Sequence, residues 1–308
     1  KNSGKSVRCL ADEIIQGCTN VNADNYNPDA NEDDGSCCIE LWGECYNIET
    51  TTQLSLGWSQ LTGEIPSKIG DLINLTYLNL RDNSLSSEIP EEIANLTNLT
   101  YLNFNNNQLS GEIPSELGNL TNLTTMGLDV NQFTGAIPVE IANLSNLLSC
   151  NLDYNQLTGE IPVEILNMIN LEGLGLSNNQ LSGEIPLEIG NLVNLEYLNL
   201  HNNQFIGFIP EEICNLDIIN PRLENNQFCP PYPDCLNDVG YQDTSECVVL
   251  GCIDLLACNY NEEANTDDGS CDYYCHDNGD YSLSFDGVDD WVDLGYDYDT
   301  HFTLDESF

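Results

Sequence analysis

Residues 99–114 read Leu99-Thr100-Tyr101-Leu102-Asn103-Phe104-Asn105-Asn106-Asn107-Gln108-Leu109-Ser110-Gly111-Glu112-Ile113-Pro114, and this pattern recurs every 24 residues between about 54 and 228. Its most regular part, Gly-x-Ile-Pro, ends at Pro66, Pro90, Pro114, Pro138, Pro162, Pro186 and Pro210, with Ser87 in place of glycine in the second copy. A fixed period of this length predicts stacked units, because one unit cannot bury its apolar face alone.

Each part of the repeat predicts a local structure. Apolar and polar residues alternate from Leu99 to Phe104, which indicates a short strand with one face inward. Asn107 ends the alternation, and its amide can pair with backbone groups of a turn inside the stack. Pro114 favours the start of a short helical turn. The equivalent asparagines, Asn83, Asn131, Asn155, Asn179, Asn203 and Asn226, are expected to form a ladder.

The wording Leu-Thr-Gly-Glu-Ile-Pro, as at residues 61–66, resembles the plant-type leucine-rich repeat over residues 38–235. The resemblance implies an α/β, right-handed solenoid with a parallel sheet on its concave face, short helical turns, and a second short strand near Leu-Thr-Gly. Residues 54–228 would supply eight strand positions. The resemblance also implies ligand binding rather than catalysis, and no catalytic motif stands out, so we expect no enzyme.

The composition excludes some classes of partner. The chain has 51 acidic and 6 basic side chains in 308 residues, a formal net charge of −45. Such a surface repels nucleic acid and anionic lipid. No apolar run approaches the ~18 residues of a membrane span, so we expect no membrane insertion. Fourteen cysteines indicate an oxidising compartment, and therefore a secreted or cell-surface protein.

Two small modules flank the repeats. Asn25-Tyr26-Asn27 leads to Asp33-Asp34-Gly35-Ser36-Cys37, and the same wording returns in residues 259–271. They resemble Cys-bounded modules of large secreted proteins of marine bacteria. Oxygen-bearing side chains alternate in both copies, as in loops that wrap Ca²⁺, so calcium is one expectation and a disulfide-closed polar loop the other. The candidate ligands are Asn25, Asn27, Asp29, Asn31, Asp33, Asn259, Asn261, Glu263, Asn265 and Asp267.

The cysteines fall mostly outside the repeats. Cys150 occupies a strand position filled by leucine in sister repeats, which favours a buried thiol, and Cys9 has no evident partner. Cys38 and Cys45 bracket Trp42 and resemble an N-terminal cap, while four cysteines around residues 214–247 resemble a C-terminal cap with its pairing open. The expected disulfide cysteines are Cys18, Cys37, Cys38, Cys45, Cys214, Cys229, Cys235, Cys247, Cys252, Cys258, Cys271 and Cys275, of which Cys258 could reach Cys275.

The last residues form a separate segment. Alternating apolar residues around Asp286-Gly287 predict two strands and a turn, and they resemble the start of a laminin-G or concanavalin-like domain. We interpret the chain as a piece of something longer. The expected organisation is a tail and module in 1–37, an N-terminal cap in 38–53, the solenoid in 54–228, a C-terminal cap in 229–250, a second module in 251–275 and a truncated sandwich in 276–308.

The outward strand residues are the candidate ligand contacts. Tyrosines at both ends with small residues between them predict a shallow trough, and Tyr with Asn suits contacts to sugars or peptides. The alternative is that these residues merely suit exposed strand positions, with Tyr77 stacked on Tyr101. The candidates are Tyr77, Asn79, Arg81, Tyr101, Asn103, Asp129, Asn151, Asp153, Tyr197, Asn199 and His201.

These observations predict a non-catalytic binding or adhesion module for an extracellular glycan or protein. One alternative is an accessory or spacer region of a larger carbohydrate-active enzyme. A minor alternative is an ice-binding surface, because the repeats would stack the hydroxyls of Thr62, Ser86, Ser110, Thr134, Thr158 and Ser182.

Overall fold

The computed structural model describes residues 14–273 except 217, 219–220, 249 and 263. The chain divides into two compact units, Lys1–Val248 and Val249–Phe308, and each is considered by itself. Cys9, Glu263, Cys275 and the predicted sandwich in 276–308 lie outside the described residues. Within these residues, no helix has the length and apolarity that crossing a membrane requires.

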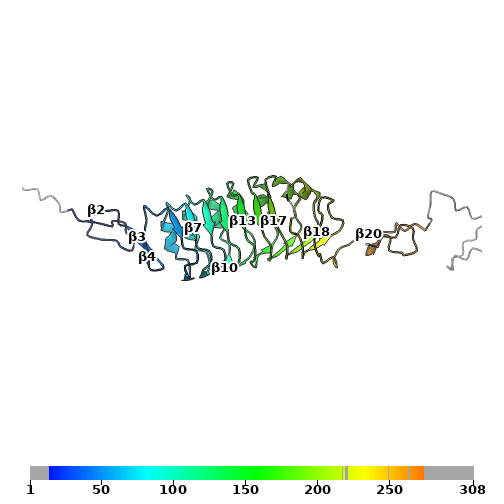
Figure 1. Ribbon diagram of the computed structural model, residues 1–308, viewed down its shortest axis with the longest axis horizontal. Helices are drawn as coiled ribbons and strands as arrows, with labels where there is room; N and C mark the ends of the chain where they lie inside the picture. Colours follow the sequence, from blue (N-terminus) through cyan, green and yellow to red (C-terminus); the bar gives the residue numbers. More distant parts are fainter. Residues whose placement is uncertain (1–13, 217, 219–220, 249, 263, 274–308) are drawn as a thin grey trace, which may run out of the picture. The chain divides into compact units, whose positions relative to one another are not determined.

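A parallel sheet of seven strands, the main sheet, runs through the repeats (Figure 1). In order it contains β5 (Gln53–Ser55), β7 (Tyr77–Asn79), β9 (Tyr101–Asn103), β11 (Thr125–Gly127), β13 (Ser149–Asn151), β15 (Gly173–Gly175) and β17 (Tyr197–Asn199). Neighbours pair with a shift of one repeat, so that Leu78 lies opposite Leu102. The solenoid prediction is therefore confirmed.

The eighth strand position is reduced to a single bridge between Asn199 and Arg222. Pro221 precedes Arg222 and has no backbone N–H to donate to the ladder, which explains why the strand does not extend there. The sheet therefore ends, as a regular ladder, at β17.

A second row of short strands lies at the Leu-Thr-Gly motif of the repeats, as the resemblance implied. It forms two four-stranded parallel sheets. The first contains β6 (Thr62–Gly63), β8 (Ser84–Ser87), β10 (Gln108–Glu112) and β12 (Gln132–Thr134), and the second contains β14 (Thr158–Gly159), β16 (Gln180–Gly183), β18 (Gln204–Phe208) and β19 (Gln227–Cys229). Between the two sheets the row continues through single backbone bonds, in which the N–H groups of Gln156 and Thr158 donate to the carbonyls of Phe133 and Gly135, both at 2.8 Å.

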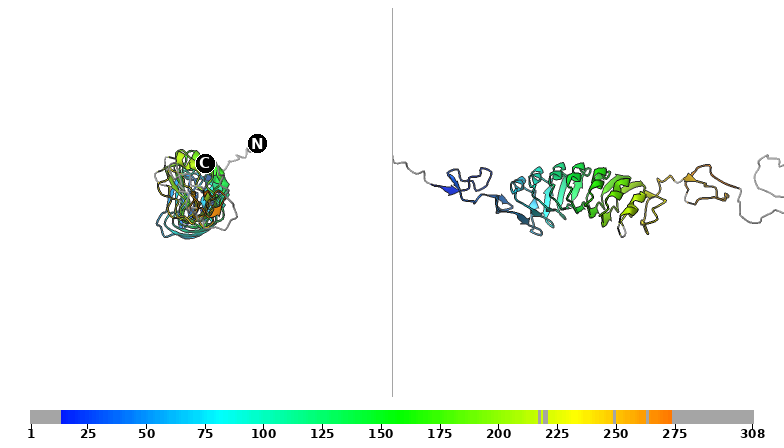
Figure 2. Two further views of the ribbon diagram at one scale, coloured as in Figure 1. Left: turned by 90° about the vertical axis from the view of Figure 1, so that its right-hand side faces the viewer. Right: turned by 90° about the horizontal axis from the view of Figure 1, so that it is seen from above.

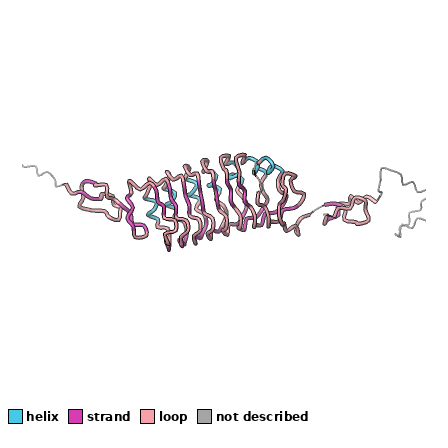
Figure 3. Tube along the Cα trace, in the orientation of Figure 1, coloured by secondary structure: helices cyan, strands magenta, loops and turns pink. Residues whose placement is uncertain are grey.

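The helical turns are all 3₁₀ turns of five residues, coloured cyan in Figure 3. They are η1 (Ser67–Asp71), η2 (Glu91–Asn95), η3 (Ser115–Asn119), η4 (Val139–Asn143), η5 (Val163–Asn167), η6 (Leu187–Asn191) and η7 (Glu211–Asn215), stacked in a row in Figure 2. Pro114 has an extended backbone (φ −63°, ψ 131°) and caps η3 rather than forming its first residue. The third and sixth positions from this proline, Leu117 and Leu120, are buried.

The asparagine ladder is confirmed. Asn155 accepts the backbone N–H of Phe133 at 3.1 Å, and its Nδ2 donates to the carbonyls of Leu128 and Leu152, both at 3.1 Å. Asn131 and Asn179 make the equivalent bonds one repeat before and after. Each amide thus joins two neighbouring repeats at a point where the chain turns inside the core.

Disulfides close both ends of the solenoid and both small modules. The observed pairs are Cys18–Cys37, Cys38–Cys45, Cys214–Cys235, Cys229–Cys247 and Cys252–Cys271. Cys258 is also disulfide-bonded, and Cys150 is free and buried as predicted. The N-terminal cap is an antiparallel hairpin of β3 (Cys38–Leu41) and β4 (Glu44–Asn47). Its Ile39 and Leu41 are fully buried and close the end of the core.

The two modules fold alike. In the first, β1 (Gln16–Gly17) pairs with β2 (Glu32–Asp33), and in the second β20 (Leu250–Gly251) pairs with β21 (Thr266–Asp267). Both also carry a parallel bridge between the first cysteine and the tyrosine of Asn-Tyr-Asn. The sequence duplication is thus a structural duplication.

Candidate ligand-binding face

The outward side chains of the main sheet form three rows, which we call the main-sheet face. The first row contains Tyr77, Tyr101, Thr125, Ser149, Gly173 and Tyr197, which lie opposite one another in register. The second contains Asn79, Asn103, Gly127, Asn151, Gly175 and Asn199. The third, just after the strands, contains Arg81, Asn105, Asp129, Asp153, Ser177 and His201.

The first row has tyrosines at both ends, and we call the stretch of small residues between Tyr101 and Tyr197 the trough. Tyr77 and Tyr101 stack with ring centroids 4.5 Å apart and planes within 8°, as expected under the alternative that these residues suit exposed strand positions. Tyr197 stands at the other end with 48% of its surface exposed. Only Thr125, Ser149 and Gly173 lie between, on the three intervening strands. Four strand spacings of about 4.8 Å make the distance from Tyr101 to Tyr197 about 19 Å.

The second-row asparagines support this trough from below. Asn103 and Asn199 each donate Nδ2 to the hydroxyl of the tyrosine two residues earlier, at 2.9 Å. The Oδ1 of Asn103 accepts the backbone N–H of Asn105 at 3.0 Å. Asn79, Asn103 and Asn199 keep 8%, 6% and 3% exposure. They were predicted as ligand contacts, but they instead fix the tyrosine hydroxyls, while Asn151 is only partly buried.

His201 is a second predicted contact that the structure buries, with 5% exposure. Burial and the nearby Arg222 charge lower the pKa of His201, so the ring is neutral at pH 7. Its Nδ1 contacts Asn199 Oδ1 and its Nε2 lies 3.2 Å from Asn178 Nδ2. The Nδ1–H tautomer satisfies both contacts, because Nδ1 then donates and Nε2 accepts. His201 therefore holds Asn199, whose Nδ2 bonds the Tyr197 hydroxyl, in place.

Two carboxylates lie side by side in the third row. Asp153 is 7% exposed, and its Oδ1 accepts the backbone N–H of Ser177 at 2.6 Å. Asp129 Oδ1 is buried without a hydrogen-bond partner. Burial raises the pKa of Asp129 to about 6, and the charges of Asp153 and Asp82 add to the shift. Asp129 is therefore an under-satisfied carboxylate at the edge of the trough.

We expect Asp129→Asn to stabilise the protein in a pH-dependent way. Because the pKa of Asp129 is higher in the folded protein than in the unfolded chain, the protonated carboxyl favours folding and the ionised carboxylate opposes it. The free energy of unfolding therefore falls as pH rises from about 4 to 6, and asparagine, which does not ionise, avoids this loss. The full shift corresponds to about 3 kcal/mol, and solvent screening of this partly exposed group reduces the expected gain to about 1 kcal/mol at pH 7.5. Urea unfolding of both proteins at pH 5.0, 6.0 and 7.5 measures the gain. An equal gain at every pH contradicts this assignment.

One exposed aromatic residue was not among the contacts predicted from the sequence. Trp58 is 63% exposed with φ +57°, and the Arg81 guanidinium stacks over its ring at 3.9 Å. Arg81 Nε also lies 3.2 Å from Asp82 Oδ2. Trp58 stands 24 residues before Asp82, so counting the period back into the irregular first repeat would have found it. This pair lies beyond Tyr77 at the N-terminal end of the main-sheet face.

The predicted calcium ligands serve as turn-forming groups. Asn27 Oδ1 accepts the N–H of Asp29, and Asp33 Oδ1 accepts the N–H of Gly35, both at 3.0 Å. Asn25 bonds the Ser36 carbonyl and the Cys38 N–H, as Asn259 does with Ser270 and Asp272 in the second copy. Within the described residues no group of three acidic, His or Cys side chains could hold a metal. Calcium binding stays a prediction.

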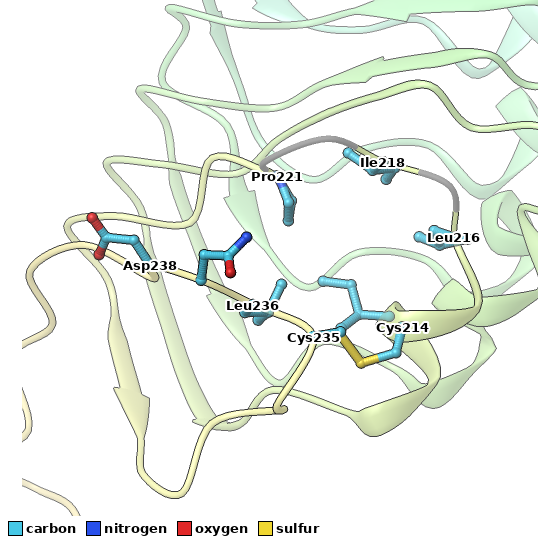
Figure 4. A pocket seen from close by; sticks show the side chains of 9 residues that line it. Cys214, Leu216, Ile218, Pro221, Cys235, Leu236 and Asp238 are labelled. Atoms are coloured by element: carbon cyan, nitrogen blue, oxygen red, sulfur yellow. A yellow bond between two sulfur atoms is a disulfide. The ribbon is translucent and has the colours of Figure 1, made fainter.

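A cavity of about 270 Å³ lies by the C-terminal cap (Figure 4). Leu216, Ile218, Pro221 and Leu236 line it, next to the Cys214–Cys235 disulfide. None of the predicted ligand contacts reaches it, and it lies where the strand ladder ends.

Family models match most of the repeats. A leucine-rich repeat region covers residues 53–154, a single leucine-rich repeat covers 146–168, and a two-copy leucine-rich repeat model covers 169–215. This chain carries leucine-rich-repeat domains. A search of curated proteins returned no match.

Solved structures similar to the leucine-rich-repeat region include plant receptors. The plant peptide hormone receptor RGFR1 in complex with RGF2 is 43% identical over 57% of this chain, with a TM-score of 0.56. The Arabidopsis receptor kinase HAESA, in complex with the peptide hormone IDA and the co-receptor SERK1, is 40% identical over 58% of this chain, with a TM-score of 0.54. The matches cover 28% and 30% of those chains, so this chain spans less than a third of their length.

Proposed function

We propose that the leucine-rich-repeat region binds an extended peptide segment of an extracellular protein along the main-sheet face. The trough between Tyr101 and Tyr197 carries this proposal, because its row holds only Thr125, Ser149 and Gly173 between two aromatic walls. A trough of about 19 Å matches about six residues of extended chain. The disulfides support an oxidising, extracellular setting.

The chemistry of the face favours a peptide over an apolar ligand. Tyr101 and Tyr197 offer rings for packing, and their hydroxyls are already oriented by Asn103 and Asn199. Pre-oriented aromatic anchors cost little conformational entropy on binding. Asp129 and Asp153 favour a ligand with a positively charged group near the third row. RGFR1, a plant peptide hormone receptor, and HAESA, in complex with the peptide hormone IDA, have similar folds, which supports a peptide ligand here.

We expect Tyr101→Ala and Tyr197→Ala each to weaken peptide binding about tenfold, because each removes an aromatic anchor. Peptides are first selected on the full chain from a random display library, and their affinities are then measured by calorimetry. The matched control is Tyr241→Ala, a tyrosine 71% exposed outside the main-sheet face. Equal affinities for all three variants and the wild type contradict the proposal.

A further inference from the structure

The first small module binds the N-terminal cap hairpin along one side, which we call the module edge. This edge contains Asp24, Asn25 and Cys37 in the first module and Cys258, Asn259 and Cys271 in the second. In the first module the N–H of Asp24 donates to the carbonyl of Cys38 at 2.9 Å, and Asp24 Oδ2 accepts the N–H of Glu40 at 2.7 Å. The carbonyl of Cys37 accepts the N–H of Ile48, just after β4, at 3.0 Å. Both halves of the hairpin are therefore bonded to the module.

The second module bonds the chain that leaves it in an equivalent way. The N–H of Cys258 donates to the carbonyl of Asp272 at 2.8 Å, and Asn259 Oδ1 accepts the N–H of Asp272 at 2.8 Å. The first module bonds Cys38 through the same two groups, both at 2.9 Å. The second edge thus already holds the first residue of the segment that follows it.

The second edge is less covered than the first. Cys37 is 3% exposed, whereas its equivalent Cys271 is only partly buried. Ile39 is fully buried, whereas its equivalent Tyr273 is 56% exposed. The first edge is covered because β3 and β4 pack on it, and Cys37 and Ile39 belong to one core with the solenoid. The described part of the second unit contains no strand equivalent to β3.

A disulfide points to the segment that covers the second edge. Cys258 stands where the first module has Asp24, and it is disulfide-bonded. The other described cysteines, apart from the free one, form the five pairs given above, so its partner is Cys9 or Cys275. Cys275 is equivalent to Leu41 of β3, the strand that Asp24 bonds. A disulfide to Cys275 would hold covalently the strand that the first module holds by a hydrogen bond.

The sequence after the second module is typical of a hairpin. Asn278-Gly279 is a preferred two-residue hairpin turn, because both residue types accept positive φ. Tyrosine and leucine, which are common in strands, lie on both sides of it or close by, in 273–275 and 281–283. The cap hairpin has the same kind of loop, since Trp42 and Gly43 have φ of +50° and +86° between the paired residues Leu41 and Glu44.

We propose that the second module docks a hairpin of residues 273–285 on its edge, as the first module docks β3 and β4. The occupant is this segment of the same chain, because the edge already bonds it at Asp272 and because it contains Cys275. The duplicated module is then a seat that fixes the first hairpin of whatever domain follows it. This inference concerns the second unit and does not rest on the peptide proposed for the main-sheet face.

The test uses the full chain. Mass spectrometry of unreduced peptides is expected to find a Cys258–Cys275 disulfide, and a Cys258–Cys9 disulfide overturns the proposal. Amide hydrogen exchange in residues 274–285 is expected to be at least about tenfold slower than in an unstructured chain, because a docked hairpin protects its N–H groups. Exchange at the rate of an unstructured chain also overturns the proposal.

A matched pair of variants separates a docked hairpin from one that is only tethered. Both carry Cys275→Leu, and one adds Cys258→Asp, which restores the residue pair of the first module, while the other adds Cys258→Ala, which has no acceptor. We expect exchange in residues 274–285 to be about tenfold slower with aspartate than with alanine, since a charged acceptor stabilises the docked strand. The N–H of Asn261, which bonds the Cys252 carbonyl at 2.9 Å, reports whether the module stays folded. Equal exchange in the two variants overturns the proposal.

Discussion

Asn155→Ala is expected to lower the free energy of unfolding by about 3 kcal/mol or more, because it leaves buried backbone groups without partners. Asn155 is 8% exposed and bonds the N–H of Phe133 and the carbonyls of Leu128 and Leu152. Alanine replaces none of these bonds, and the buried site gives water little access. Urea unfolding followed by circular dichroism measures the effect.

The control for this prediction is Asn143→Ala, the same truncation at an exposed position at the end of η4. It is expected to change the unfolding free energy by less than about 0.5 kcal/mol. Because repeats are stabilised mainly by their neighbours, a defect at Asn155 should also broaden the transition by uncoupling the two halves. Similar losses for both variants would show that the ladder does not hold the repeats together.

Gly173→Tyr is expected to weaken binding of a wild-type-selected peptide about 100-fold or more, because the new ring fills the trough between Ser149 and Tyr197. The position accepts this side chain: a Cβ there would meet only Ser149 Oγ, at an ordinary 3.7 Å. Tyrosine also occupies the same row at Tyr77, Tyr101 and Tyr197. The loss is measured by calorimetry, with the melting temperature as the check on folding.

Thr158→Tyr is the matched control, since it adds the same ring on an exposed residue of β14, in the second row of strands. It is expected to leave peptide affinity within about twofold, because it leaves the trough open. Full affinity in Gly173→Tyr would mean that the selected peptides bind elsewhere.

The period predicted features that depend on one residue type at a repeated position. The Asn107-type ladder, the Tyr77–Tyr101 stack and the buried thiol of Cys150 all follow from the 24-residue spacing. In each case the neighbours that decide the environment are copies of the same residue or apolar residues at equivalent repeat positions. For these features, the sequence of one repeat is sufficient to predict the structure in the whole stack.

The period did not predict how far neighbouring side chains cover one another. Asn79, Asn103 and Asn199 alternate outward, yet each is buried because its amide bonds to a tyrosine hydroxyl of its own strand. His201 is covered for a similar reason, by contacts to two asparagines. Burial in this face depends on contacts between side chains, which the alternation of apolar and polar residues does not report.

Residues that differ from the repeat pattern change the local structure in ways that the pattern alone does not predict. Ala136 is a minor variation in the sequence, but its short side chain leaves Gly159 uncovered, because the glutamates of the sister repeats extend over the glycine of the next repeat. Trp58 was not predicted, because the first repeat lacks most of the repeat motif. In both cases the missing signal was a comparison of each position with its equivalents 24 residues away.

Photo-crosslinking most directly tests which surface receives the peptide. A selected peptide carrying a benzophenone group is irradiated with the full chain, and the labelled residues are identified by mass spectrometry. Binding in the trough predicts labels on β9, β11, β13, β15 and β17, which an excess of unlabelled peptide suppresses. Suppressible labels on the 3₁₀ turns or the second row of strands would contradict recognition by the main-sheet face.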